Sequence, residues 1–241
     1  MEKIRLQKAL AMAGVASRRA SEKLIEQARV EVNDQIIAEQ GFRVCLDTDV
    51  IKVDGARISF DKNKIVLVLN KPIGVESTMS IETNNTSLAD LIPVKYKGIF
   101  PIGRLDKNTT GLLLFTNDGE LTYRLSHPKY KVSKKYICLI AGQIGNNKIK
   151  QLLQGVSLED GLSRFDKVKI IGSNGDKTIL EIILHSGKNR IIRRTLKALG
   201  FEILELSRIA FGSIMLGELK LGKMRVLSAT EVGSLAKLVQ L

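Results

Sequence analysis

Apolar positions near the N-terminus recur with the spacing of amphipathic helices. An apolar stripe along residues 3–13 predicts a first helix, and Gly14 is expected to end it. Ser17 is expected to cap a second helix with its hydroxyl group. Alternating segments at 30–34 and 41–55 then predict small strands. Two short helices followed by small strands predict a compact N-terminal unit.

Longer apolar segments follow and predict a larger unit built mainly from strands. The polar stretch 60–64 is the expected linker, and it divides the chain into domains 1–62 and 63–241. Strands outnumber helices, and several neighbouring segments alternate like hairpin strands. The pattern therefore predicts an α+β fold, in which a small α/β domain precedes a mixed, largely antiparallel sheet with flanking helices. Strands are predicted within 65–75, 98–106, 111–118, 134–142, 165–172, 177–187 and 201–212, and helices within 118–125, 146–156 and 190–200.

The net charge of the chain indicates a polyanionic binding partner. Lysine and arginine number 38 against 25 aspartates and glutamates, which gives a net charge of +13. Of those 38 cations, 27 lie after residue 62. A surplus of this size suits nucleic acid better than a neutral metabolite. A basic enzyme with no such partner is the alternative interpretation.

The few cysteines and histidines argue against a metal-binding protein, a redox enzyme and a disulfide-rich secreted protein. Cys45 and Cys138 lack metal-ligand spacing, and His127 and His185 lie far apart, so neither a zinc site nor a disulfide framework is predicted. The stretch 172–178 lacks the Gly-Lys pair of a phosphate-binding loop. No apolar run approaches the ~20 residues that span a bilayer. We therefore expect a cytoplasmic protein without a metal, a cofactor or a membrane partner.

The predicted helix at 190–200 carries the densest basic surface. Its four cations fall at positions i, i+3, i+4 and i+7, which places them on one face. No carboxylate lies within 189–200 to offset their mutual repulsion, so phosphate contact is favoured over a merely solvated face. The four cations are Arg190, Arg193, Arg194 and Lys197.

Two other segments combine cations with features that suit RNA. Within 127–136, lysines alternate with Tyr130 and Tyr136, and this mixture suits single-stranded or flipped nucleotides. An ordinary strand position is the alternative for Tyr136. The start of the second helix is also basic, and free N–H groups there favour phosphate, although a solvated helix face is the alternative. The expected RNA-contacting cations of these segments and of the N-terminus are Lys134, Lys135, Arg5, Arg18, Arg19 and Lys23.

The stretch GRLDKNTTGLLLF (103–115) holds one carboxylate between a glycine turn and an apolar strand. Asp106 has Arg104 two residues before it and Lys107 directly after it. A turn-capping aspartate is the simple interpretation. The functional interpretation is a catalytic carboxylate at a strand end, facing a substrate that the neighbouring cations hold.

Motifs along nearly the whole chain resemble known families. LQKALAMAGVASRRASEKLIEQARVEVND resembles an S4 RNA-binding domain, which implies that the first helix, the SRR turn and the next helix contact RNA. GRLDKNTTGLLLFTNDGEL closely resembles the catalytic motif of the RsuA/RluB family of ribosomal pseudouridine synthases. NKPIGV, KKYICLIAG, GKNRIIRRTLKALGF and RIAFGSIMLGELKLGKMR match further motifs of that family in the same order. The run GVSLEDG (155–161) is most similar to the RluB branch, whose members modify large-subunit ribosomal RNA.

This resemblance implies roles for individual residues. Asp106 matches the essential aspartate of the family, and Tyr136 matches the aromatic residue that stacks on the target base. Arg193 matches the arginine that pairs with the aspartate. Leu221 matches an apolar residue that lines the base pocket, and Arg104 is expected to contact the substrate beside Asp106.

The implied reaction is the site-specific isomerisation of uridine to pseudouridine in 23S ribosomal RNA. It breaks the N1–C1′ bond, turns the uracil and rejoins it through C5, so it requires no cofactor, metal or energy source. An ionised carboxylate can attack C1′ or remove the C2′ proton, an arginine keeps it charged, and the base must flip out to reach it. We expect a monomer that acts on ribosomal RNA or its assembly precursor. A 16S-modifying enzyme of the same family and a non-catalytic assembly factor are the alternatives.

Overall fold

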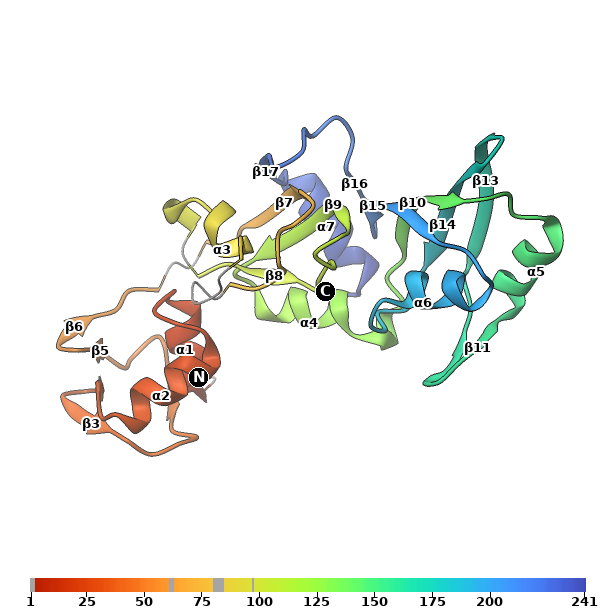
Figure 1. Cartoon of the computed structure of the whole chain (residues 1–241). Helices are drawn as coiled ribbons and strands as arrows, with labels where there is room; N and C mark the ends of the chain where they lie inside the picture. The colour runs from red at the N-terminus through yellow and green to blue at the C-terminus, as the bar shows by residue number, and fades with distance from the viewer. Residues whose placement is uncertain (1–2, 61–62, 80–84, 97) are drawn as a thin grey trace. The chain divides into compact units, whose positions relative to one another are not determined.

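The computed structural model describes residues 3–60, 63–79, 85–96 and 98–241 (Figure 1). The predicted linker 60–64 includes two positions that lie outside the described residues. Within the described ranges, no helix combines the length and the apolar character that crossing a bilayer requires.

The chain divides into two compact units. Met1–Lys64 and Ile92–Phe100 make up the first, and Ile65–Leu91 and Pro101–Leu241 make up the second. The returning segment packs closely on the first unit, because a Cβ atom at Gly98 would lie 2.8 Å from the Met12 carbonyl oxygen. The first unit is therefore completed by residues that follow part of the second in the sequence.

Among its described residues, the first unit contains two α-helices, two small sheets and a 3₁₀ turn at Val94–Tyr96. Helix α1 (Leu6–Met12) begins later than the 3–13 pattern predicted, because β1 (Ile4–Arg5) pairs with β4 (Arg43–Val44). The Ser17 hydroxyl caps α2 (Arg18–Glu26) as predicted, accepting a hydrogen bond from the Ala20 amide at 3.2 Å. The second sheet has the order β3–β2–β5–β6, with β2 (Val30–Val32), β3 (Gln35–Ile37), β5 (Ile51–Val53) and β6 (Ala56–Arg57).

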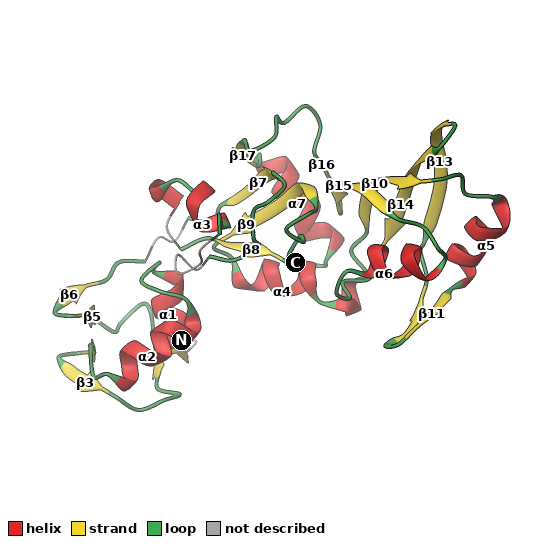
Figure 2. Cartoon of the chain, viewed as in Figure 1, coloured by secondary structure: helices red, strands yellow, loops and turns green. Residues whose placement is uncertain are grey.

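A nine-stranded sheet dominates the second unit (Figure 2). Its main path has the order β13–β14–β10–β15–β9–β7–β17, with β16 beside β15 and β8 beside β9. The β15–β9 pair is parallel, and the other pairs along the path are antiparallel, which confirms the predicted mixed, largely antiparallel sheet. The strands are β7 (Val66–Lys71), β8 (Phe100–Ile102), β9 (Thr110–Thr116), β10 (Lys134–Ala141), β13 (Lys167–Asn174), β14 (Lys177–Leu184), β15 (Ile203–Phe211), β16 (Ile214–Met215) and β17 (Met224–Val226).

Helices cover this sheet and form the core with it. Leu125 of α4 (Gly119–Ser126) and Leu235 of α7 (Ala229–Leu238) pack into one cluster with residues of β7 and β9. Asp118 caps α4 as predicted, and its carboxylate accepts from the Glu120 and Leu121 amides. Helix α6 (Ile191–Ala198) buries its apolar side, including Leu196.

Some elements were absent from the sequence prediction. They include a two-stranded hairpin, β11 (Val156–Leu158) and β12 (Gly161–Ser163), between α5 (Asn146–Gln154) and β13. The short helix α3 (Leu88–Leu91) and the C-terminal helix α7 were also missed, although Ser228 and Glu231 form a capping box at the start of α7. The hairpin matters most, because it supplies a carboxylate near the site described next.

Candidate active site

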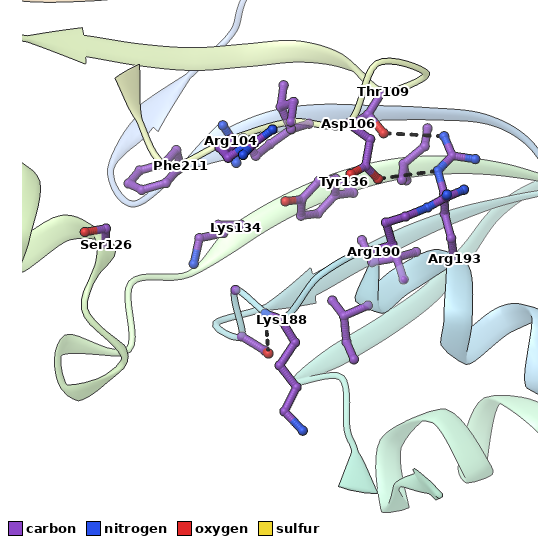
Figure 3. A pocket seen from close by; sticks show the side chains of 18 residues that line it. Arg104, Asp106, Thr109, Ser126, Lys134, Tyr136, Lys188, Arg190, Arg193 and Phe211 are labelled. Carbon is purple, nitrogen blue, oxygen red and sulfur yellow. Dashed lines mark hydrogen bonds and ion pairs between the residues drawn. The ribbon is translucent and has the colours of Figure 1, made fainter. Parts of the chain in front are cut away.

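A pocket of about 330 Å³ opens on the second unit, where the loop before β9 faces β10, β15 and α6 (Figure 3). Its walls combine apolar surface with many cations, and Asp106 is the one carboxylate among the lining residues. The lining residues are Gly103, Arg104, Leu105, Asp106, Thr109, Ser126, Lys134, Tyr136, Ser186, Gly187, Lys188, Arg190, Ile191, Ile192, Arg193, Leu206, Arg208 and Phe211.

Asp106 lies in the loop that joins β8 to β9. The Ser77 hydroxyl holds the preceding residue, accepting from the Leu105 amide at 3.1 Å and donating to the Leu105 carbonyl at 2.6 Å. The Thr109 amide donates to the Asp106 carbonyl at 3.0 Å and closes the turn. The Asp106 side chain is 35% exposed. The backbone of this loop is thus tied on both sides of a carboxylate that stays accessible.

Glycine at position 111 permits the close approach of strands behind this loop. Its φ is +103°, and a Cβ atom there would lie 2.3 Å from the Arg208 carbonyl oxygen. This glycine sits where β9 runs parallel to β15, with Gly111 opposite Arg208. A larger residue would push the two strands apart and shift the end of the loop that carries Asp106.

Lys71 lies fully buried beneath the Asp106 loop. Its ammonium group donates to the Pro72 and Val75 carbonyls, both at 2.8 Å, and to the Lys107 carbonyl at 3.4 Å. Burial lowers the pKa of Lys71 to about 8, and the nearby charge of Asp106 opposes that shift. This lysine belongs to the NKPIGV motif, for which the sequence alone indicated no role.

The structure brings Arg193 of α6 beside Asp106. The Nε atom of Arg193 lies 3.7 Å from Asp106 Oδ2, which makes an ion pair without a hydrogen bond. Its Nη2 atom donates to the Asn108 carbonyl at 2.7 Å and lies 3.4 Å from the Thr109 hydroxyl. Figure 3 shows the guanidinium directed at both Asp106 and Thr109. Arg193 therefore links helix α6 to the loop and places positive charge next to the carboxylate.

Tyr136 and Lys134 project from β10 into the same pocket. Tyr136 is 9% exposed. Lys134 was expected on an RNA-contacting surface, but its ammonium group instead donates to the Val132 and His185 carbonyls at 3.2 and 2.9 Å. Burial is the main cause that lowers the pKa of Lys134 to about 8, and the positive charge of Arg208 lowers it further. Lys134 is thus a pocket residue held by backbone carbonyls.

Arg194 of α6 has an internal acidic partner, although no carboxylate lies within 189–200 of the sequence. The β11–β12 hairpin carries Asp160, which accepts two hydrogen bonds from Arg194, at 2.8 and 3.1 Å. This contact lowers the pKa of Asp160 and raises that of Arg194. The pair forms because the hairpin places an acidic residue 34 positions away in the sequence against the helix.

The other predicted site residues fall into four groups. Arg104, Arg190 and Lys197 are exposed; Arg104 and Arg190 line the pocket, while Arg190 and Lys197 line a second depression beside it. Lys135 pairs with Glu181 at 3.3 Å. Leu221 was expected in the base pocket but lies outside its lining, 56% exposed in the turn before β17. In the first unit, all four cations that were predicted to contact RNA are exposed: Arg5, Arg18, Arg19 and Lys23.

Sequence reasoning missed two residues of the pocket floor. Arg208 and Phe211 lie on β15 and line the pocket, although their stretch RIAFG was noted only as a matching motif. Nothing in the local pattern separates them from ordinary strand residues. Among the described residues, no group of three or more His, Cys, Asp or Glu side chains is placed to hold a metal ion.

Comparison with known protein families matches both units. Residues 65–198 match the model of the RNA pseudouridylate synthase family, and residues 4–58 match the S4 domain. The first match covers more than half of the chain and contains Asp106, Tyr136 and Arg193. The second lies within the first structural unit.

Individual relatives align over nearly the full length. The chain is 42% identical over 241 residues to an uncharacterized RNA pseudouridine synthase of Mycobacterium bovis, covering 99% of this chain and 95% of that protein. It is 36% identical to the ribosomal large subunit pseudouridine synthase B of Bacillus subtilis, covering 97% and 96% of the two chains. A crystal structure of a pseudouridylate synthase superposes with a TM-score of 0.70 at 25% identity, covering 96% of this chain and 99% of that one.

Proposed function

The chain belongs to the RNA pseudouridylate synthase family, and from this premise we propose that it isomerises a specific uridine of large-subunit ribosomal RNA. That it is a pseudouridine synthase acting on RNA follows from the family. The ribosomal target is supported by similarity to the Bacillus subtilis enzyme and to a Vibrio cholerae enzyme of the same name, 37% identical. The RluB-like run at 155–161 contains β11 and the turn that leads into β12, and it favours the same target.

The observation that carries the mechanism is a single accessible carboxylate in a pocket lined by cations. Asp106 Oδ2 lies 3.7 Å from Arg193 Nε, so a positive charge stands directly beside the carboxylate. An ionised Asp106 can attack C1′ or remove the C2′ proton as the N1–C1′ bond breaks. Both routes use residues that the fold holds in place, and neither calls for a cofactor.

The remaining residues position the nucleotide. A uridine within an RNA helix cannot reach Asp106 unless it flips out of the stack. Tyr136, almost buried in the pocket floor, supplies the face on which the flipped base stacks. Arg104 and Arg190 stand exposed among the lining residues, where they can hold the flanking phosphates.

A direct assay tests this function. RNA carrying tritium at C5 of the target uridine releases the label when C5 joins C1′, so release should follow enzyme turnover. Mapping pseudouridine in ribosomal RNA from cells with and without the protein identifies the target. Loss of one modification in 23S RNA is expected. Loss in 16S RNA would favour the small-subunit alternative, and RNA binding without tritium release would favour an assembly factor.

Substitutions in helix α6 separate free cations from paired ones. Arg190→Gln should reduce the slope of log Kd against log salt concentration by about 0.7 to 0.9, because the exposed Arg190 has no ion-pair partner among the described residues. Arg194→Gln should change the slope much less, since Asp160 already neutralises Arg194. Filter binding between 50 and 300 mM salt measures both slopes. Equal changes in the two variants would contradict the assignment.

The N-terminal unit is expected to anchor the RNA without entering the chemistry. The double substitution Arg18→Gln with Arg19→Gln should weaken RNA binding about tenfold, because both cations are exposed at the start of α2. The single-turnover rate at saturating RNA should stay within about twofold of wild type. Substitution is preferable to deletion of residues 1–62, since that deletion would strip the segment 92–100 of its packing partners. A lower saturating rate with unchanged Kd would contradict this role.

A further inference from the structure

Arg208 is a buried cation that the proposed mechanism does not use. It is 2% exposed, and its Nε atom donates to the Leu112 carbonyl at 2.7 Å. Within the part of the chain that the structure describes, its Nη2 atom has no hydrogen-bond partner. A buried guanidinium with unused donors is costly unless something else accepts from it. Arg208 lines the pocket, so a bound substrate can supply the acceptor.

The neighbours of Arg208 leave its charge without a counter-ion. The Phe211 ring lies 5.2 Å from Arg208 Cζ and 5.6 Å from Lys134 Nζ, so two cations flank one aromatic ring. Neither cation has an ion pair among the described residues, and Asp106 already faces Arg193. Asp166, whose charge acts on Lys134, contacts His185 at 2.8 Å. This end of the pocket therefore favours negative charge on whatever enters it.

The strand register places Arg208 next to the expected position of the base. In the antiparallel pair of β10 and β15, Arg208 is the partner of Tyr136. Directly opposed residues hold their Cβ atoms roughly 4.5 to 5.5 Å apart. A phosphate follows the RNA strand along the rim of the pocket, whereas a flipped base reaches the floor. The acceptor for a floor residue beside Tyr136 is thus an oxygen of the base.

We propose that Arg208 donates hydrogen bonds to a carbonyl oxygen of the target uracil and holds the base while it is detached from the ribose. The proposal rests on the proposed function. When the N1–C1′ bond breaks, its electron pair leaves with the base, and the negative charge spreads over N1, O2 and O4. A guanidinium fixed beside the base stabilises that charge where it develops.

The way the uracil rotates allows one fixed hydrogen-bond donor to contact the base both before and after the rotation. The uracil rotates about the axis through N3 and C6, which exchanges N1 with C5 and also O2 with O4. The position that one carbonyl oxygen holds before the rotation is therefore taken by the other carbonyl oxygen after it. The C5–C1′ bond then forms, C5 loses its proton, and N1 takes up a proton, so the reaction is balanced as an isomerisation. Arg208 therefore meets a carbonyl oxygen in both orientations of the base, releasing one oxygen and accepting the other as the base rotates.

Sulfur-substituted substrates test this contact. Single-turnover rates are measured on RNA with uridine, 2-thiouridine or 4-thiouridine at the target position, because sulfur accepts hydrogen bonds weakly. We expect each thio substitution to slow the wild-type enzyme by about tenfold. Arg208→Gln should slow the uridine reaction by about 100-fold, with RNA affinity within about twofold of wild type. The thio substitutions should lower the single-turnover rate of this variant by less than about twofold, since the variant has already lost the contact.

Two controls separate this contact from other effects. Arg104→Gln removes a different pocket cation and should keep the full thio effects of the wild-type enzyme. Arg208→Lys retains a positive charge and replaces Arg208→Gln in this test if that variant does not fold. We expect the thio substitutions to slow Arg208→Lys less than they slow the wild-type enzyme. If the wild-type enzyme converts the three substrates at equal rates, this result alone overturns the inference. Full thio effects in the Arg208 variants would also overturn it, whereas a wild-type enzyme that cannot convert uridine would contradict the proposed function instead.

Discussion

Asp106→Asn is expected to abolish pseudouridine formation, with a loss on the order of 10⁵-fold or more. Asparagine keeps the size of the side chain, and the backbone bond from the Thr109 amide to the carbonyl of residue 106 remains. A turn-capping residue would lose little, because asparagine caps about as well as aspartate. A catalytic residue loses its anion and with it the means to attack C1′ or to stabilise a cationic sugar. Conversion of target RNA, measured by mass spectrometry, decides between these interpretations.

Stability and RNA affinity should stay close to wild type in the same variant. Asp160→Asn is the matched control, because it removes a carboxylate that lies near the pocket but outside its lining. This control should retain turnover. Measurable turnover in an uncontaminated preparation of Asp106→Asn that is free of deamidation would contradict a catalytic role for Asp106.

Arg193→Lys is expected to lower the single-turnover rate by about 100-fold while weakening RNA binding by less than about threefold. The guanidinium has two tasks: Nη2 holds the Asn108 carbonyl at 2.7 Å, and Nε faces Asp106 at 3.7 Å. A lysine ammonium is a single point on a flexible stem and cannot reach both positions at once. Arg190 and Lys197 remain exposed for phosphate contact, so affinity should change little.

Arg194→Lys provides the comparison within the same helix. Arg194 holds Asp160 through two hydrogen bonds and makes no contact with the Asp106 loop among its hydrogen bonds in the described residues. Its replacement by lysine should leave turnover within about threefold of wild type, since an exposed pair contributes little. An equal loss of turnover in the two variants would contradict the assignment of the pairing role to Arg193.

Two helix caps and the positions of the long strands were predictable because they depend on neighbours in the sequence. Ser17 and Asp118 cap helices as predicted, since a cap bonds to amides two or three residues away. Alternation within single segments likewise predicted long strands such as β10 and β14. The start of α1 was displaced because Ile4–Arg5 found a strand partner at Arg43–Val44, far away in the sequence.

What the sequence determined about the site is the chemistry of its central loop. The motif around Asp106 specified a carboxylate between a glycine turn and a strand, and the resemblance paired it with Arg193 and Tyr136. The structure places all three around one pocket. Their catalytic roles remain predictions that the variants above test.

Only the tertiary structure decided which charges are free and which are occupied. Asp160 meets Arg194 across 34 residues, the His185 carbonyl meets Lys134 across 51, and the Leu112 carbonyl meets Arg208 across 96. Periodicity and capping carry no information about such pairs, because each pair forms only when the sheet brings distant segments together. For the same reason Leu221 resembled a pocket residue in its motif and yet lies outside the pocket lining. A local pattern specifies what a side chain can do, whereas the fold determines what it contacts.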